Sequence, residues 1–219
     1  MHSEDKTYVI AVLKEMLAIR KDIRIMASPW TCAKWRKVNN LTERKPFDSW
    51  TSGQLNPAYY GDYATYFVKY IQAMKAEGIN ITSVTIQNEP LNRYNSASLY
   101  MTWQEQRDFI KTALGPTFRD AGIQSKIIVY DHNYNYDNGG EQQNYPIKVY
   151  NALGQNYDGS ELVVGAAFHD YGGSNTELTN VHNKATDKDL IFSESSIGTW
   201  NNGRNLSKRL VEDMKNINL

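Results

Sequence analysis

Residues 83–90 read Ser-Val-Thr-Ile-Gln-Asn-Glu-Pro, a β-prone apolar run that ends in a carboxylate and a proline. Proline cannot donate a ladder hydrogen bond, so the strand stops there and Glu89 falls at its carboxyl-terminal tip. Residues 189–195, Asp-Leu-Ile-Phe-Ser-Glu-Ser, repeat this arrangement with Glu194 at the tip. Either glutamate taken singly could be a helix-capping carboxylate or a solvated loop charge. Together they predict a (β/α) barrel, in which catalytic groups lie at the strand tips.

Strand-like and helix-like segments alternate along the chain. Helices are predicted over 8–20, 57–77, 102–121, 145–154, 177–184 and 205–216, and strands over 23–27, 81–87, 126–130, 162–168 and 190–193. Apolar spacing of three and four residues marks the helices, Gly78 ends the second, and Gly115-Pro116 is expected to kink or restart the third. The pattern predicts α/β architecture with about five βα units. The glutamates at the strand tips favour the (β/α)8 TIM-barrel type. A doubly wound open sheet fits the same pattern.

The overall composition excludes several classes of partner and site. The chain has 24 basic and 24 acidic residues in 219, so we expect no nucleic-acid partner. No apolar stretch is long enough to serve as an integral membrane segment, and the N-terminus lacks the apolar core of a signal peptide. The single Cys32 excludes an intrachain disulfide. The four histidines lack metal-ligand spacing, so no metal and no cofactor are expected.

Aromatic residues are abundant, with 15 tyrosines and five tryptophans. Their faces suit the C–H-rich faces of sugars, and the polar tips of Tyr and Trp can bond hydroxyl groups. Ordinary core packing explains any single aromatic residue equally well.

Every predicted strand ends in polar or aromatic residues. The first ends in Ala-Ser-Pro-Trp over 27–30, the third in Tyr-Asp-His-Asn over 130–133, and the fourth in Phe-His-Asp-Tyr over 168–171. Such residues are typical of a binding rim at the carboxyl-terminal face of a barrel.

Four further motifs lie along the chain: Trp-Arg-Lys at 35–37, Gln-Asn-Glu-Pro at 87–90, Gln-Arg-Asp-Phe-Ile at 106–110 and Phe-Ser-Glu at 192–194. In these motifs and in their order along the chain, the protein resembles glycoside hydrolase family 30, which contains glucosylceramidase and endo-β-1,6-glucanases. The resemblance implies that Glu89 is the general acid/base and Glu194 the nucleophile.

The same resemblance implies roles for the residues around the two glutamates. Asn88 resembles the residue that bonds the sugar 2-hydroxyl, and Trp30 resembles a wall of the sugar pocket. His169 and Tyr171 resemble a pair whose polar tips reach the nucleophile and the sugar. The remaining residues expected to bind substrate are Asp131 and His132. One departure is Asp170, where many members have an aromatic residue, and we expect it to reshape the rim.

The resemblance covers barrel strands three to seven. We therefore expect residues 1–219 to be a partial TIM-barrel catalytic domain that lacks the first two strands, the last strand and the side β-sandwich. The family implies a secreted or periplasmic parent protein, although this chain shows no signal peptide. The implied partner is a β-linked carbohydrate or glycolipid.

The resulting hypothesis is a retaining β-glycoside hydrolase, acting on β-1,6-glucan or a glucosylceramide-like substrate by double displacement. This mechanism requires Glu89 to hold a proton near neutral pH while Glu194 stays ionised. The alternative is a non-catalytic carbohydrate-binding barrel or an inactive fragment of such an enzyme.

Overall fold

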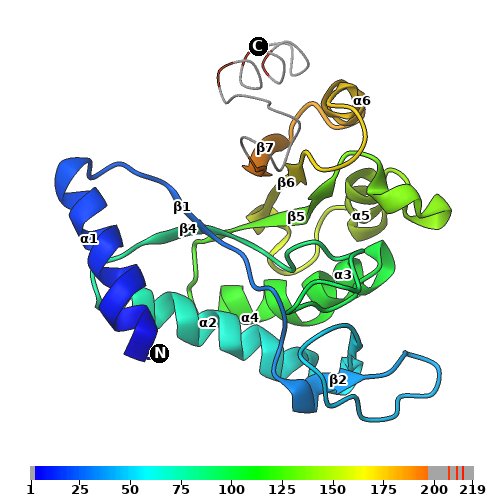
Figure 1. Cartoon of the computed structure of the whole chain (residues 1–219), viewed down its shortest axis with the longest axis horizontal. Coiled ribbons are helices and arrows are strands. Elements are labelled where there is room, and N and C mark those ends of the chain that lie inside the picture. The colour runs from blue at the N-terminus through cyan, green and yellow to red at the C-terminus, as the bar shows by residue number, and fades with distance from the viewer. Residues whose placement is uncertain (1–2, 197–206, 208–210, 212–213, 215–219) are drawn as a thin grey trace.

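Five parallel strands form the sheet at the centre of the fold. The computed structural model describes residues 3–196 together with residues 207, 211 and 214. The strands are β1 (Ile25–Ala27), β4 (Ile81–Thr85), β5 (Lys126–Asn133), β6 (Val163–His169) and β7 (Asp189–Glu194). Each pairs with the next one along the chain (Figure 1). Sequential order belongs to a barrel wall, whereas the order of a doubly wound sheet reverses at a switch point. The barrel prediction is therefore confirmed over the doubly wound sheet.

One face of this wall is packed against helices, and the other is hollow. The helices are α1 (Ile10–Ile19), α2 (Tyr60–Ala76), α3 (Trp103–Phe109), α4 (Gly115–Asp120), α5 (Tyr145–Leu153) and α6 (Thr176–Lys184). On the other face, side chains from all five strands line a hollow of about 600 Å³. The helix predicted over 205–216 lies, apart from Ser207, Val211 and Met214, outside the described residues.

Local sequence signals set the ends of the helices. Gly78, at φ +81°, ends α2, and the N–H of Ile79 returns to the carbonyl oxygen of Met74 at 3.0 Å. At the start of α3, Thr102 and Glu105 form a capping box, each side chain bonding the backbone of the other residue.

The predicted interruption near Gly115-Pro116 is confirmed. The segment is divided into α3, a π-helical turn over Ile110–Leu114, and α4. Proline lacks the N–H needed for a continuous ladder. A side chain at position 115 would also collide with the carbonyl oxygen of Asp158, because a Cβ atom there would lie only 2.7 Å from it. This close approach requires glycine.

The long connection between β1 and α2 contains a small sheet that the sequence patterns did not reveal. Strands β2 (Lys37–Val38) and β3 (Gln54–Leu55) pair antiparallel. Beside them the buried Lys37 ammonium donates to the carbonyl oxygens of Trp50, Ser52 and Ser98, at 3.1, 2.8 and 2.7 Å. Burial lowers the pKa of Lys37 to about 8. This side chain joins β2 to two loop segments that are far apart in sequence, one at residues 50–52 and one at residue 98.

Many of the aromatic residues belong to the core. The ring of Tyr130 packs against Tyr136, Tyr145 and Phe168, with centroid distances of 5.1, 5.0 and 5.6 Å. All four rings are essentially inaccessible to solvent. For these residues packing is the correct explanation of the aromatic bias.

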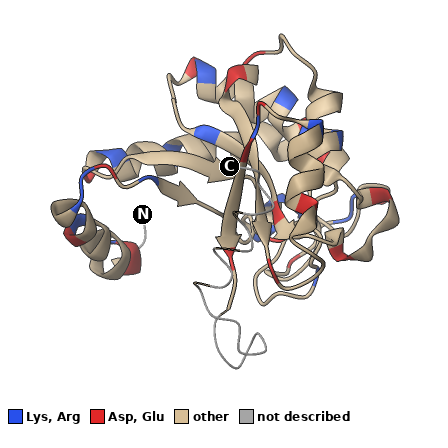
Figure 2. Ribbon diagram, turned by 90° about the horizontal axis from the view of Figure 1, so that it is seen from above, with Lys and Arg blue, Asp and Glu red and all other residues tan. Residues whose placement is uncertain are grey.

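The described surface carries charges of both signs. Figure 2 shows acidic and basic residues interspersed over the helices and loops. Within the described part of the chain, every helix is too short or too polar to cross a bilayer.

We predict that residues 1–219 expressed alone self-associate. The outer strands of the described sheet, β1 and β7, pair on one side only, and such edges template association. On α1, Val12, Met16 and Ile19 are 53, 44 and 88% exposed. Light scattering should report species larger than a monomer, and Ile19→Lys should reduce them. A monomer with one sharply cooperative melt would contradict this prediction.

Candidate active site

The expected site residues gather at the carboxyl-terminal edge of the sheet. Glu89 follows β4, Asp131 lies near the end of β5, and His169 and Glu194 are the last residues of β6 and β7. His169 and Glu194 are direct partners in the β6–β7 register. All the strands run in one direction, so their tips meet at one rim, as the sequence predicted.

Glu89 is held at a sharp corner of the backbone. Its φ is +46°, and Pro90 follows it directly. Its N–H donates to the carbonyl oxygen of Asp131 at 2.9 Å, which joins the end of β4 to β5. A left-handed conformation costs a non-glycine residue roughly 1–3 kcal/mol, and such strain tends to occur at functional sites.

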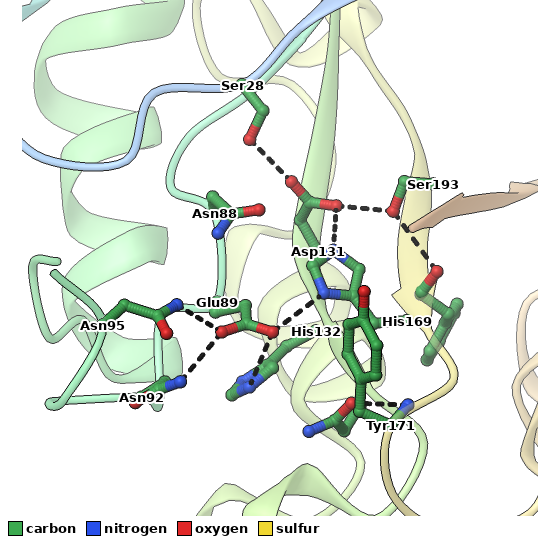
Figure 3. A network of polar contacts seen from close by, with 12 residues as sticks. Ser28, Asn88, Glu89, Asn92, Asn95, Asp131, His132, His169, Tyr171 and Ser193 are labelled. Atoms are coloured by element: carbon green, nitrogen blue, oxygen red, sulfur yellow. Dashed lines mark hydrogen bonds and ion pairs between the residues drawn. The ribbon is translucent and has the colours of Figure 1, made fainter. Parts of the chain in front are cut away.

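A bulge in β5 supports the same corner. Tyr130 pairs with Ala167 and His132 with Phe168, so Asp131 is an extra residue between them. Tyr130 and Asp131 have φ values of +72° and +76°. Bulges next to active sites redirect side chains, and here the inserted side chain points among the strand tips (Figure 3).

The two glutamates approach each other closely. One carboxylate oxygen of Glu89, one of Glu194 and a ring nitrogen of His169 all lie within 4.8 Å of one another. Carboxyl groups of retaining glycosidases are about 5–5.5 Å apart, and those of inverting enzymes about 6.5–9.5 Å. The nearest carboxylate oxygens thus lie closer together than the inverting range, and a retaining mechanism stays a prediction. The three groups are also possible metal ligands, but His169 is already bonded to two carboxylates, and the absence of a metal stays a prediction.

Asp131 is the buried centre of the hydrogen-bond network (Figure 3). Its side chain is 1% exposed, and Ser28 and Ser193 donate to its oxygens at 2.7 and 2.6 Å. The Thr85 hydroxyl lies 2.9 Å away, and the His169 Nε2 atom 3.0 Å away. Both oxygens are therefore occupied by protein donors. Asp131 was expected to contact substrate; in this structure it is buried and bonded to His169, and its role toward a substrate stays a prediction.

His169 bridges two anions. Its Nδ1 atom lies 3.2 Å from Glu89 Oε1, and its Nε2 atom bonds Asp131. Burial alone lowers the pKa of His169, but the hydrogen bonds to Asp131 and Glu89 outweigh it and raise the pKa to about 9. Both ring nitrogens therefore carry protons at neutral pH, and each donates to a carboxylate.

The protonation state of Glu89 differs from the sequence expectation. Burial raises its pKa, but the His169 hydrogen bond, the nearby His132 ring and the amides of Asn92 and Asn95 lower the pKa to about 2. Glu89 was expected to hold a proton near neutral pH. The two pKa shifts instead favour a proton on His169 and an ionised Glu89, because the imidazolium between two carboxylates is stabilised by both anions.

His132 lies behind Glu89. Its Nε2 atom is 3.9 Å from Glu89 Oε1 and 3.4 Å from Asp137 Oδ2, and the side chain is 1% exposed. Burial lowers the pKa of His132, and the nearby Asp137 and Glu89 carboxylates oppose this shift. Neither ring nitrogen has a hydrogen-bond partner among the described residues. The buried ring borders Glu89, and its expected contact with substrate stays a prediction.

Asn92 and Asn95 belong to the site but were missed by the sequence reasoning. Both side-chain amides donate to Glu89 Oε2, at 2.9 Å from Asn92 and 2.5 Å from Asn95. They lie in the loop after Pro90, which has no helical or strand periodicity. Two asparagines shortly after a catalytic-type glutamate were the available signal.

The remaining expected residues lie around the rim. Trp30 and Tyr171 are 44 and 43% exposed, so both can meet a ligand. Asn88 is buried, and its Nδ2 atom has no partner among the described residues, which leaves a free donor beside Glu89. The N–H of Asp170 bonds the carbonyl oxygen of Glu194 at 3.3 Å. The substrate roles of these residues stay predictions.

Comparisons with known proteins agree with this geometry. Residues 1–211 match the model of the glycosyl hydrolase family 30 TIM-barrel domain. The chain belongs to this family. The resemblance noted in the sequence is thereby confirmed.

The relatives include two fungal enzymes and one solved structure. An endo-1,6-beta-D-glucanase of Neurospora crassa is 35% identical over 176 residues, which are 79% of this chain and 33% of the relative. A Trichoderma harzianum endo-1,6-beta-D-glucanase is 32% identical over 209 residues, covering 89% and 39%. A solved endo-beta1,6-glucanase structure is 60% identical, with a TM-score of 0.89, over 99% of this chain and 47% of that one. The chain thus spans less than half the length of these relatives.

We predict that folding stability falls as the pH rises above about 6.5. A group whose pKa is raised on folding stabilises the folded state fully at pH values below its unfolded-state pKa. This stabilisation is lost as the pH rises through the folded-state pKa. For His169 this window runs from about 6.5, the unperturbed value, to about 9. The loss should be at most roughly 1.4 kcal/mol per pH unit. Denaturant titrations between pH 6.5 and 7.5 stay below the pKa of Lys37, about 8, so most of that ammonium keeps its proton.

Asp131→Asn is the matched variant for this measurement. It removes the anion that holds the His169 proton, so the pH dependence should shrink and stability should fall by roughly 3–5 kcal/mol. The control is Asp187→Asn, at a side chain that is 72% exposed. An unchanged slope in Asp131→Asn would mean that another group titrates.

Proposed function

We propose that this chain carries the catalytic carboxylates of a retaining β-glycosidase acting on β-1,6-linked glucan. The observation that supports it is the approach of the Glu89 and Glu194 carboxylate oxygens to within 4.8 Å of each other at the strand tips. The 60% identical structure is an endo-beta1,6-glucanase, which favours glucan over a glycolipid substrate.

In the first step Glu194 attacks the anomeric carbon. The bond between that carbon and the leaving oxygen breaks as Glu89 delivers a proton to the oxygen, and a glycosyl–Glu194 ester forms. In the second step a water oxygen attacks the same carbon, its proton passes to Glu89, and Glu194 is released as a carboxylate. Two inversions return the original β configuration.

His169 supplies the proton for this cycle. It and Glu89 share one proton across 3.2 Å, and in the free site that proton lies on the ring. Transfer to Glu89 Oε1, when the leaving oxygen arrives, converts the carboxylate into the required acid. Asp131 stabilises the ring throughout, because it accepts the Nε2 hydrogen bond in either state.

We expect Glu194→Ala in the full-length protein to abolish hydrolysis of β-1,6-glucan, because no other group forms the ester. Glu89→Ala should slow hydrolysis by roughly 10²–10⁴-fold. With an activated aryl β-glucoside, whose leaving group needs no proton, Glu89→Ala should retain a burst that azide converts into turnover. Initial-rate NMR of the wild type should show the β anomer first.

The control is Glu15→Ala, on the exposed side of α1, which should behave like the wild type. If neither active-site variant changed the rate, both role assignments would be wrong. Binding of glucan by the full-length protein without cleavage would favour the non-catalytic alternative. An α product would indicate an inverting site.

A further inference from the structure

The loop that follows Glu89, residues 91–98, is anchored at both ends and exposed at its tip. The Arg93 guanidinium stacks on the Tyr100 ring at 3.5 Å from its centroid. The carbonyl oxygen of Ser98 accepts from the buried Lys37 at 2.7 Å, and its N–H donates to Trp50 at 3.0 Å. Between these anchors the Tyr94 side chain is 90% exposed.

A single amide connects Tyr94 to Glu89. The Nδ2 atom of Asn92 donates to Glu89 Oε2, and the Oδ1 atom of the same side chain accepts the N–H of Tyr94, both at 2.9 Å. Asn95 donates to the same Glu89 oxygen from the other side of Tyr94. The backbone of Tyr94 is thus linked to the Glu89 carboxylate through the side chain of Asn92.

The two oxygens of Glu89 face different surroundings (Figure 3). Oε1 lies toward His169, whereas Oε2 lies toward Asn92 and Asn95. In a double displacement the leaving group departs from the side opposite the nucleophile, next to the acid. We therefore expect the departing sugar on the Glu89 side, away from β7, where loop 91–98 follows Glu89 in the chain.

We propose that loop 91–98 forms the leaving-group subsite, in which Tyr94 stacks on the pyranose that departs and Asn92 and Asn95 position Glu89. This inference rests on the proposed function and deepens it. A rigid aromatic face suits a sugar ring. The subsite thus favours a saccharide leaving group over the flexible alkyl chain of a lipid.

The amides of Asn92 and Asn95 act on the reaction through Glu89. Fixing the carboxylate in one rotamer places its acidic oxygen, and a displacement of about 1 Å can cost about 10²-fold in rate. The same two donors favour the ionised carboxylate, so removing either one should raise the pKa of Glu89.

The test compares two substrates of the full-length protein that differ only in the leaving group. One is a β-1,6-linked glucotetraose, and the other is the β-fluoride of the corresponding disaccharide, whose leaving group is fluoride. Tyr94→Ala should lower kcat/KM for the tetraose relative to the fluoride by roughly 3- to 10-fold. Tyr94→Phe keeps the aromatic face and should restore most of the ratio. Tyr8→Ala, at a tyrosine that is 68% exposed, is the control.

Asn92→Ala and Asn95→Ala are expected to lower kcat for the tetraose by roughly 10- to 100-fold. They should also shift the pH profile of kcat/KM upward, which a general loss of stability would not do. Asn80→Ala, at an exposed asparagine before β4, should change neither.

The outcomes separate this inference from the proposed function. If the wild type cleaves both substrates and Tyr94→Ala lowers both equally or neither, the subsite is wrong while the function stands. Unshifted pH profiles in both asparagine variants would overturn the positioning role. If the wild type cleaves neither substrate, the proposed function fails, and this inference fails with it.

Discussion

One buried charge determines the arrangement of the strand tips. Burying a carboxylate is costly unless it is paired and fully hydrogen-bonded. Asp131, on β5, meets this demand with Ser28 after β1, Thr85 on β4, His169 on β6 and Ser193 on β7. A single side chain therefore contacts residues from the other four strands of the described sheet. If one strand tip moved away, the Asp131 carboxylate would lose a hydrogen bond.

The electrostatic surroundings of Glu89 depend on Asp131. Because Asp131 holds a proton on His169, Glu89 faces a cation on one oxygen and two amides on the other. This environment stabilises a charge at a corner where the backbone is strained. The site is therefore organised before any ligand arrives, which is the condition for electrostatic preorganisation.

The sequence predicted the parts of this site that depend on local patterns. Glu89 and Glu194 were identified because strand-like runs end at them, and parallel pairing then required them to share a rim. The roles of Asp131 and His132 could not be predicted in this way. A polar strand end looks the same whether it meets substrate or is buried, and the bulge that buries Asp131 has no periodic signal. The short β2–β3 sheet was missed because its pairing closes a loop, and Asn92 and Asn95 were missed because their loop has no periodic pattern.

The bulge in β5 has a further consequence for how this strand can vary. Side chains on a strand alternate between its two faces, and an inserted residue reverses the alternation beyond it. The side chains of the aliphatic stretch from Ile127 to Val129 and those of the polar tip from Asp131 to Asn133 therefore alternate independently between the two faces of the sheet. Mutations can change the packing of the aliphatic stretch without changing the direction of the side chains at the polar tip. A one-residue deletion at the junction, by contrast, would remove the bulge, and with it the position from which Asp131 contacts the neighbouring strand tips.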